Sequence, residues 1–341
     1  MSRNKVLVLF GGESSEHAVS VSSATNIVEA MNIEFYEVFL GYITEEGEWQ
    51  QVKSIDTRDE PIGVLRPMLG KRHFIINDEV LEVDVILPVL HGKNGEDGSV
   101  AALGQLLHIP VVGCDMTAGA VAMDKYVTKQ LVGAFGVPIV PFVTHRAGDE
   151  MLDFDELRED LGSPLFVKPS RAGSSVGVHK VSSQSSLVSA LEDAHRHDDR
   201  ILIEKAIDAR ELEVAVLGNY PEMQASSVGE IIPDGDFYSY ESKYDKSSKS
   251  AVAIPADIPD HIAEQLQEYA LSIFEIIGGS GLARIDFFID KKTEAIWFNE
   301  VNTFPGFTNI SMYPKLWEAA GVSYSELIER LIALAIERGG V

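Results

Sequence analysis

The chain has 341 residues, of which 53 are acidic and 28 are basic, giving a formal net charge of −25 at pH 7. Such acidity argues against a protein that binds nucleic acid or anionic membranes, because both call for a basic surface. The single cysteine, Cys114, cannot form an internal disulfide, and no apolar run reaches membrane-spanning length. With no signal sequence before the first strand, we expect a cytoplasmic protein of two or three domains, with Cys114 buried rather than catalytic.

The first 115 residues predict an α/β domain with a mostly parallel sheet. The β-branched run 5–10 ends at a glycine pair and precedes a helical pattern over residues 20–31. The run 83–90 is apolar throughout, which suits a strand covered on both faces. A short strand at residues 111–112 closes the unit.

Polar residues follow both of the long strands. Glu16 comes after the first strand and His91 directly after the second, at the carboxyl edge where open α/β sheets bind ligands. For Glu96 and Asp97, a turn with a helix cap explains the residues as well as a functional role does.

Residues 116–208 predict a small α+β unit with a Gly/Ser loop at 168–177. The loop lacks the Gly-Lys-Ser/Thr of a Walker loop. Its backbone amides and the hydroxyls of Ser174 and Ser175 suit a phosphate, with Lys168 beside them, although a flexible hairpin turn is an equal alternative. Lys125 is another candidate phosphate contact, whose alternative is a solvated helix lysine. The expected helices are 118–135, 154–161 and 185–195, and the expected strands are 140–142, 165–168, 177–181 and 201–204.

Residues 209–341 predict a third unit that ends in a hairpin and a helix. Its expected strands are 211–217, 282–289 and 295–301, and its expected helices are 259–277 and 325–338. Between the second and third units, Glu204 ends a strand and Glu211 follows seven residues later, a spacing that suits reading an adenine amine and a ribose hydroxyl.

The late hairpin carries the most informative side chains. Pairing residue 289 with residue 295 puts two sets on one face: an apolar floor of Phe288, Ile296 and Phe298, and a polar cluster of Arg284, Asp286, Glu300 and Asn302. Because Mg²⁺ prefers hard oxygen ligands and shares itself with phosphates, this face suits a nucleotide with a metal ion. A structural ion pair between Arg284 and a carboxylate is the alternative.

Eight segments occur in the order expected of a D-alanine–D-alanine ligase, so the chain resembles that family of the ATP-grasp superfamily from Val6 to about Arg338. The segments are GGESSEHAVS (11–20), HGKNGEDG (91–98), MDK (123–125), VKPSRAGSSVG (167–177), LIEK (202–205), FYSYESKY (237–244), ARIDFF (283–288) and NEVNTFPGFTNIS (299–311). The resemblance implies an α/β fold of three domains, expected at residues 1–115, 116–208 and 209–341, with ATP between the second and third.

The resemblance also implies the ATP and metal contacts. The residues expected at the phosphates are Lys125, Lys168, Ser174 and Ser175. Those expected at adenine and ribose are Glu204, the backbone near Lys205 and Ile207, and Glu211. Phe237, Lys243, Phe288 and Phe298 complete the expected nucleotide contacts. Asp286, Glu300 and Asn302 are expected to bind two Mg²⁺, for which Mn²⁺ can substitute.

The implied reaction joins two D-alanine molecules into a dipeptide for peptidoglycan precursors. The carboxylate of the first attacks the γ-phosphate of ATP, and the amine of the second attacks the resulting acyl phosphate. Glu16 is expected to hold the first ammonium, with His91 in the same substrate site. Ser311 and the Met312 backbone are expected to hold the second carboxylate, and Arg284 with the Gly306 N–H the tetrahedral oxyanion.

A lid at residues 235–250 is expected to close the site through a hydrogen-bond chain of Glu16, Ser174 and Tyr244. A tyrosine there, with no histidine between His197 and His261, favours a dipeptide over a D-alanine–D-lactate product. D-serine or D-lactate as second substrate remains an alternative. A non-catalytic nucleotide-binding regulator would lack metal or oxyanion residues, and none is missing. The resemblance further implies a homodimer through the N-terminal domain.

The sequence departs from the family pattern at three alanines, Ala101, Ala102 and Ala172. None of them is a proposed metal or oxyanion residue, so they bear on loop packing.

Overall fold

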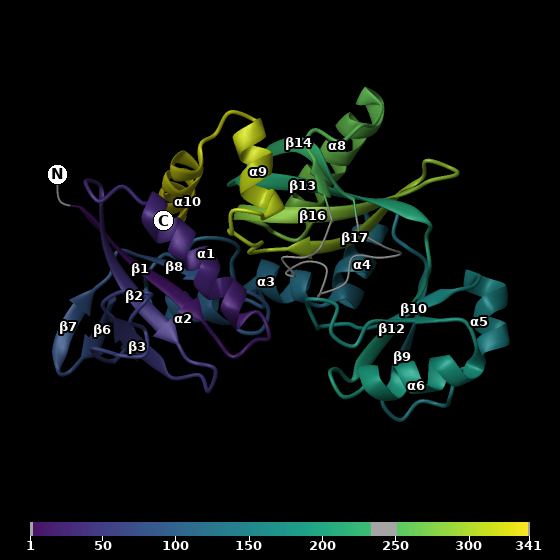
Figure 1. Ribbon diagram of the computed structural model, residues 1–341, viewed down its shortest axis with the longest axis horizontal. Helices are drawn as coiled ribbons and strands as arrows, with labels where there is room; N and C mark the ends of the chain where they lie inside the picture. The colour runs from purple at the N-terminus through teal and green to yellow at the C-terminus, as the bar shows by residue number, and fades with distance from the viewer. Residues whose placement is uncertain (1–2, 233–250, 340–341) are drawn as a thin grey trace.

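The computed structural model describes residues 3–232 and 251–339 and contains three main sheets (Figure 1). The expected lid, with Phe237, Lys243 and Tyr244, lies outside these residues.

The N-terminal sheet contains the parallel strands expected from the sequence, with antiparallel strands added at one edge. Its order is β4 (Gly63–Val64), β3 (Trp49–Val52), β2 (Tyr36–Ile43), β1 (Asn4–Gly11) and β8 (Val85–Val89). β1 pairs in parallel with β2 and β8, whereas β3 pairs antiparallel with both of its neighbours. Helices α1 (His17–Ala30) and α2 (Ser99–Leu107) follow β1 and β8, and a small antiparallel sheet is formed by β5 (Arg66–Met68), β6 (His73–Ile76) and β7 (Glu79–Glu82).

The predicted helix at 118–135 is two helices, α3 (Met116–Met123) and α4 (Lys125–Ala134). Asp124 has extended backbone angles and ends α3, and its carboxylate accepts hydrogen bonds from the Tyr126 and Val127 amides at the start of α4. The break follows from the preference of aspartate for this capping position.

The middle sheet forms a separate lobe (Figure 1). Its order is β11 (His179–Val181), β10 (Leu165–Pro169), β12 (Arg200–Lys205) and β9 (Phe142–Arg146), and all neighbouring strands are antiparallel. The strand expected at 140–142 thus begins two residues later, at Phe142. One face packs apolar residues such as Val167 and Ile203 on α5 (Phe154–Leu161) and α6 (Gln184–Ala194). Because side chains alternate along a strand, Lys168 and Glu204 lie together on the other face.

The third sheet has the order β15 (Ala251–Ala253), β14 (Gln224–Ile232), β13 (Ala209–Gly218), β16 (Gly281–Asp290) and β17 (Ile296–Asn302). Its first face, with Val214 and Ile285, packs on α8 (Asp260–Ile276). The inner end of its second face packs on α9 (Met312–Ala319) and α10 (Tyr324–Gly339).

The first and third units share one hydrophobic core. Side chains of β1, β8 and α1 join those of β13, β16, α9 and α10 in a single buried cluster, and Figure 1 shows α10 beside α1. The middle lobe has its own cluster. The second face of the third sheet therefore packs against the carboxyl edge of the N-terminal sheet, and the middle lobe faces that junction.

Candidate functional site

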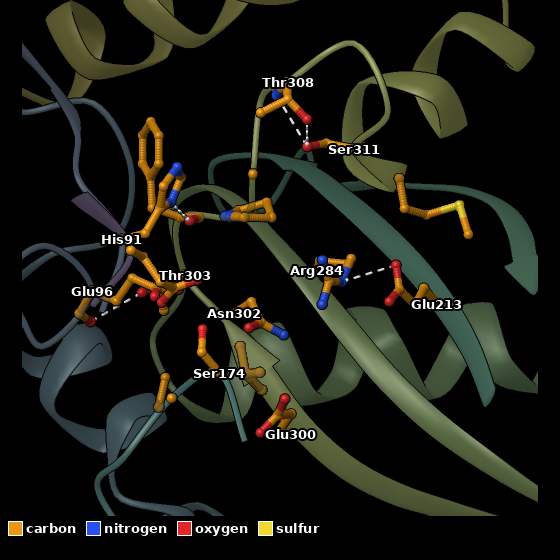
Figure 2. Close-up of a pocket in the computed structure, with 18 of the residues that line it drawn as sticks. His91, Glu96, Ser174, Glu213, Arg284, Glu300, Asn302, Thr303, Thr308 and Ser311 are labelled. Carbon is orange, nitrogen blue, oxygen red and sulfur yellow. Dashed lines mark hydrogen bonds and ion pairs between the residues drawn. The ribbon is translucent and has the colours of Figure 1, made fainter. Parts of the chain in front are cut away.

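A polar pocket of about 150 Å³ lies where the three units meet (Figure 2). It is smaller than the roughly 300–1,000 Å³ typical of sites for drug-sized ligands, which suits small polar molecules. Its lining unites many residues predicted from the sequence: Glu16, His91, Glu96, Lys125, Ser174, Arg284, Glu300, Asn302, Gly306, Ser311 and Met312. Other predicted residues, Lys168, Glu204, Glu211 and Phe288, lie outside this lining, toward the middle lobe or farther along the third sheet.

The hairpin of β16 and β17 differs from the predicted register. Ile289 pairs with Ile296 rather than with residue 295, and a bulge adds one residue between the Phe287–Phe298 and Asp286–Glu300 pairs. The pairs Arg284–Asn302 and Asp286–Glu300 therefore share a face, as predicted. Phe298 and Ile296 turn to the opposite face, where both are buried in the core cluster that also contains side chains of α3, α4 and α8, so the predicted floor of Phe288, Ile296 and Phe298 is wrong.

The sequence analysis missed two residues that the bulge brings to the face of the sheet that carries Arg284 and Asp286. Trp297 pairs with Phe288, so those two rings share a face. Asn299 is the extra residue, and its Oδ1 accepts a hydrogen bond from Lys168 Nζ at 3.5 Å. A one-residue bulge leaves no signal in an alternating pattern, so neither position stood out.

The Arg284 guanidinium holds the polar cluster together. It donates two hydrogen bonds of 2.7 Å to the Asp286 carboxylate and lies 3.1 Å from Glu213 Oε2, while Asn302 donates to Asp286 Oδ2 at 2.9 Å. Burial would lower the pKa of Arg284, but the carboxylates of Asp286 and Glu213 outweigh it and raise that pKa well above its usual value. The predicted ion-pair alternative is thus present, and Glu213 is a member that sequence reasoning missed.

The Gly/Ser loop contacts the polar cluster through Lys125. Its Nζ donates to the Ala172 carbonyl at 2.8 Å and lies 3.3 Å from Glu300 Oε2. Ser174 and Ser175 both have left-handed backbone angles, with φ of 50° and 59°. Such angles cost energy for residues other than glycine and tend to persist at functional loops.

Two carboxylates, the half-buried Asp124 and the buried Asp198, anchor the base of this loop. Asp124, which begins α4, accepts a hydrogen bond of 2.6 Å from Ser170 Oγ. Asp198 accepts the Arg171 amide at 2.7 Å and also binds its guanidinium. Burial would raise the pKa of Asp198, but its bonds to Arg171 hold that pKa at about 2. Asp198 therefore keeps the loop tied to the middle lobe at neutral pH, and Asp124 joins the loop to α4.

Glu204 lies between two lysines on the face of the middle sheet that meets β17. Its Oε2 is 2.6 Å from Lys168 Nζ and its Oε1 is 3.2 Å from Lys129 Nζ. Burial would raise the pKa of Glu204, but the two lysines hold it below its usual value. The Lys205 amide donates within the lobe, to the Pro141 carbonyl. Sequence reasoning missed Lys129, whose only signal is its position one helical turn after Lys125.

His91 and Glu96 form the wall contributed by the N-terminal unit. His91 Nδ1 lies 3.1 Å from the Phe304 carbonyl and must donate to it, so Nε2 accepts from Ser23 Oγ at 3.1 Å. Burial lowers the pKa of His91, which favours this neutral form. Glu96 accepts the Gly92 amide at 2.7 Å, and burial together with the charge of Glu16 raises its pKa to about 8.

The turn expected at residues 96 and 97 is present, α2 begins after Gly98 without a side-chain cap, and a functional role stays a prediction. Asp97 accepts hydrogen bonds from the Asn94 and Ser99 amides, so it shapes the turn that leads into α2. Glu96 lines the pocket.

The far wall is the start of helix α9. Ser311 precedes the helix, and its Oγ accepts the Thr308 amide at 3.0 Å and contacts Thr308 Oγ1 at 2.8 Å (Figure 2). A side chain at Gly306 would place a Cβ 2.7 Å from Ser311 Oγ, so only glycine fits there without a shift. Unpaired amides at a helix N-terminus favour an anion, as the expected substrate carboxylate requires.

Cys114 is buried and unpaired with any other cysteine, and burial raises the pKa of its thiol to about 11. This confirms that it is not poised as a nucleophile. Among the described residues, no helix is both long and apolar enough to cross a membrane.

Comparison with known proteins identifies the family. Family models described as D-ala D-ala ligase N-terminus and C-terminus match residues 5–114 and 131–333. The chain belongs to the D-alanine–D-alanine ligase family. The D-alanine–D-alanine ligase of Oceanobacillus iheyensis is 43% identical over 98% of this chain and 96% of the relative.

Solved structures agree with this membership of the D-alanine–D-alanine ligase family. The ligase of Coxiella burnetii superposes with a TM-score of 0.89 at 32% identity, covering 100% of this chain and 96% of that one. The VanG D-Ala:D-Ser ligase of Enterococcus faecalis has the same TM-score at 35% identity, covering 98% of this chain and 100% of that one. The ATP-grasp architecture expected from the sequence is confirmed.

Proposed function

We propose that the protein uses ATP to join two D-alanine molecules into D-alanyl-D-alanine through an acyl phosphate, for peptidoglycan precursor synthesis. Family membership supports this activity. The observation that carries it is the single pocket in which Glu16, the Gly/Ser loop and the Arg284 cluster meet. These groups suit an ammonium, a phosphate and a developing oxyanion, respectively.

Each D-alanine has charged groups for which the pocket offers partners. Glu16 binds the ammonium of the first D-alanine, next to the neutral His91, whose ring nitrogens are both occupied by protein groups. Ser311 and the Met312 amide at the start of α9 bind the carboxylate of the second. The two substrates are thereby held by opposite walls, with their reacting groups directed between them.

Arg284 and the Gly306 N–H stabilise the oxyanion formed when the second amine attacks the acyl phosphate. Arg284 suits this role because Asp286 and Glu213 fix its orientation before substrate arrives. Preorganised donors of this kind are worth about 10²–10³ in rate when removed singly.

ATP lies between the middle lobe and the third sheet. Lys125, Lys168, Ser174 and Ser175 contact its phosphates, and Phe288, Glu211, Glu204 and the backbone at Lys205 and Ile207 contact its nucleoside. Phe298 is not part of this proposal, because it is buried on the other face of the sheet. Phe237 and Lys243 stay expected contacts from outside the described residues, as does Tyr244 of the lid.

The residues at the phosphate end fit divalent metal ions. Asp286, Glu300 and Asn302 offer two carboxylates and an amide, and Mg²⁺ completes such a set with phosphate oxygens and water. Among the described residues, no group of three or more His, Cys, Asp or Glu side chains forms a self-sufficient metal site. From the chemistry of their side chains, we assign these three residues to two Mg²⁺, or Mn²⁺, that share the triphosphate. The ions would neutralise phosphate charge during transfer.

D-serine as second substrate is the alternative product choice. It is favoured by the close likeness to the D-Ala:D-Ser ligase of Enterococcus faecalis, which is 35% identical. Tyr244 of the lid favours D-alanine, by resemblance alone.

The organisation of the molecule in the cell follows as a further part of the proposal. We place domain boundaries at residues 1–115, 116–208 and 209–341. We also place the protein in the cytoplasm, where ATP is available, as a homodimer formed through its N-terminal domain.

The test is ADP release by the purified protein with ATP and Mg²⁺, with and without D-alanine, combined with mass spectrometry of the products. We expect ADP release to depend on D-alanine and D-alanyl-D-alanine to form. Parallel reactions with D-alanine plus D-serine or D-lactate identify the second substrate. ADP appearing equally fast without D-alanine would contradict the ligase assignment.

A further inference from the structure

Lys129 is a buried charge that the proposed reaction does not use. Its side chain on α4 is fully shielded from solvent, 3.2 Å from Glu204 Oε1 and 5.9 Å from the centre of the Phe298 ring. Burial lowers the pKa of Lys129 to about 8, although Glu204 opposes this. A buried ammonium is costly, so its presence here calls for a function.

The two lysines around Glu204 differ in what they can reach. Lys168 is the penultimate residue of β10, at the base of the Gly/Ser loop, and its side chain is 11% exposed. Lys129 is sealed in, and neither its Nζ nor Glu204 Oε1 has a well-aligned hydrogen-bond partner among the described residues. A triphosphate at the loop would draw Lys168 toward itself, whereas Lys129 would stay beside Glu204.

We propose that Lys129 sets the nucleobase preference by keeping Glu204 ionised when Lys168 turns to the triphosphate. This inference rests on the proposed contact between Glu204 and adenine. An ionised carboxylate only accepts hydrogen bonds, so it matches the exocyclic amine of adenine. A buried carboxylate without a cation takes up a proton, and its O–H would then donate to a carbonyl at the same position of the base.

The test compares ATP with inosine triphosphate, which carries a carbonyl where adenine carries its amine. In Lys129→Met we expect KM for ATP to rise about tenfold while kcat and KM for D-alanine stay within about twofold. The ratio of kcat/KM for ATP to that for inosine triphosphate should fall about tenfold or more, since a mismatched polar group governs such discrimination. Lys129→Arg, which keeps the charge, should retain most of the ratio. Lys180→Met, an exposed change on β11, is the matched control.

Calorimetric titration of both nucleotides onto the same variants measures the preference even if no ligation is detected, so failure of the proposed function is distinguishable from failure of this inference. If Lys129→Met does not fold, Glu204→Gln takes its place, because an amide that both donates and accepts should relax the preference in the same way. An ATP preference as strong in the substituted protein as in the original would overturn the inference.

Discussion

At the scale of single residues, the pocket contains two carboxylates on its N-terminal wall, Glu16 and Glu96, although the proposed reaction brings only one ammonium group to this wall. Glu96 and Glu16 both line it, and the charge of Glu16 adds to burial in raising the pKa of Glu96 to about 8. Glu96 is therefore mostly protonated at neutral pH in the ligand-free protein. Its ionisation is favoured only when a cation, such as a substrate ammonium, enters beside it.

Replacing Glu96 by glutamine should remove a pH dependence of stability. The folded-state pKa of about 8 lies above the ordinary value of 4.5, so the stability contributed by neutral Glu96 is complete below about pH 4.5 and is lost as the pH rises through 8. Glutamine cannot ionise and keeps the Gly92 bond. The free energy of unfolding, measured in denaturant, should therefore fall more from pH 5 to pH 9 in the original protein than in Glu96→Gln. A difference that stays constant across this range would count against the raised pKa.

At the scale of elements, short connections place the catalytic groups. Asp124 ends α3, begins α4 and binds Ser170, so the helix that carries Lys125 and the Gly/Ser loop are joined through one side chain. Asp198 holds the other side of the loop through Arg171. Substrate binding therefore meets a loop whose base is fixed and whose tip, at Ser174 and Ser175, bears the strained backbone.

Loosening the base of the loop should slow the reaction more than it weakens the fold. Asp198→Asn removes the charge that binds Arg171, and we expect kcat to fall about tenfold, because a loop that fails to close leaves phosphates poorly placed. Asp199→Asn is the matched control: Asp199 also contacts Arg171, but its side chain is 69% exposed, and exposed pairs contribute little. Steady-state kinetics of both variants test this, and equal effects would show that the burial of Asp198 does not matter.

Elements with strong periodicity or capping signals could be predicted from the sequence, and others could not. β1, β8, β16 and β17 were recognisable from long apolar or alternating runs. Residues 49–82 form several short strands whose polar, turn-rich sequence carries no clear period, and the eight-residue β2 was not predicted either. Helix α9 is only eight residues long and contains Pro314, which is tolerated in a first turn but obscures the pattern.

The residues of the candidate site likewise divide into those that could be predicted from the sequence and those that could not. Residues within ordered motifs, such as Ser174, Arg284 and Asn302, reach one pocket as predicted. Glu213 and Lys129 are brought to their partners by packing between elements, which one sequence does not reveal. The bulge changed the face of Phe298 because register depends on pairing geometry as well as on alternation.

At the scale of the whole molecule, the joined N-terminal and third units meet the middle lobe at the proposed nucleotide site. The N-terminal and third units share a core, which α10 extends by packing on α1 and β8. The middle lobe meets them through polar contacts such as that of Lys168 with Asn299, whereas α3 and α4 pack in the core of the third sheet. A net charge of −25 is compatible with anionic substrates because Lys125, Lys168 and Arg284 place positive groups at this junction.

Nucleotide binding should therefore protect the lobe more than the shared core. With a non-hydrolysable ATP analogue and Mg²⁺, hydrogen exchange should slow in residues 165–178 and 200–205, because ligand contacts suppress local opening there. Exchange in β1 and β8 should change little. Mass spectrometry of peptide fragments makes the comparison, and uniform protection over the whole chain would contradict a two-part architecture.

The paired Arg284 and Asp286 side chains have a consequence for the order in which ligands are added. Asp286 already accepts two hydrogen bonds from a buried guanidinium, so a divalent cation arriving alone competes with an internal counterion. A cation that arrives already chelated by a triphosphate brings anions of its own, which compensate for that competition. Free Mg²⁺ should therefore be a weak ligand, and the metal–nucleotide complex should act as the true first substrate.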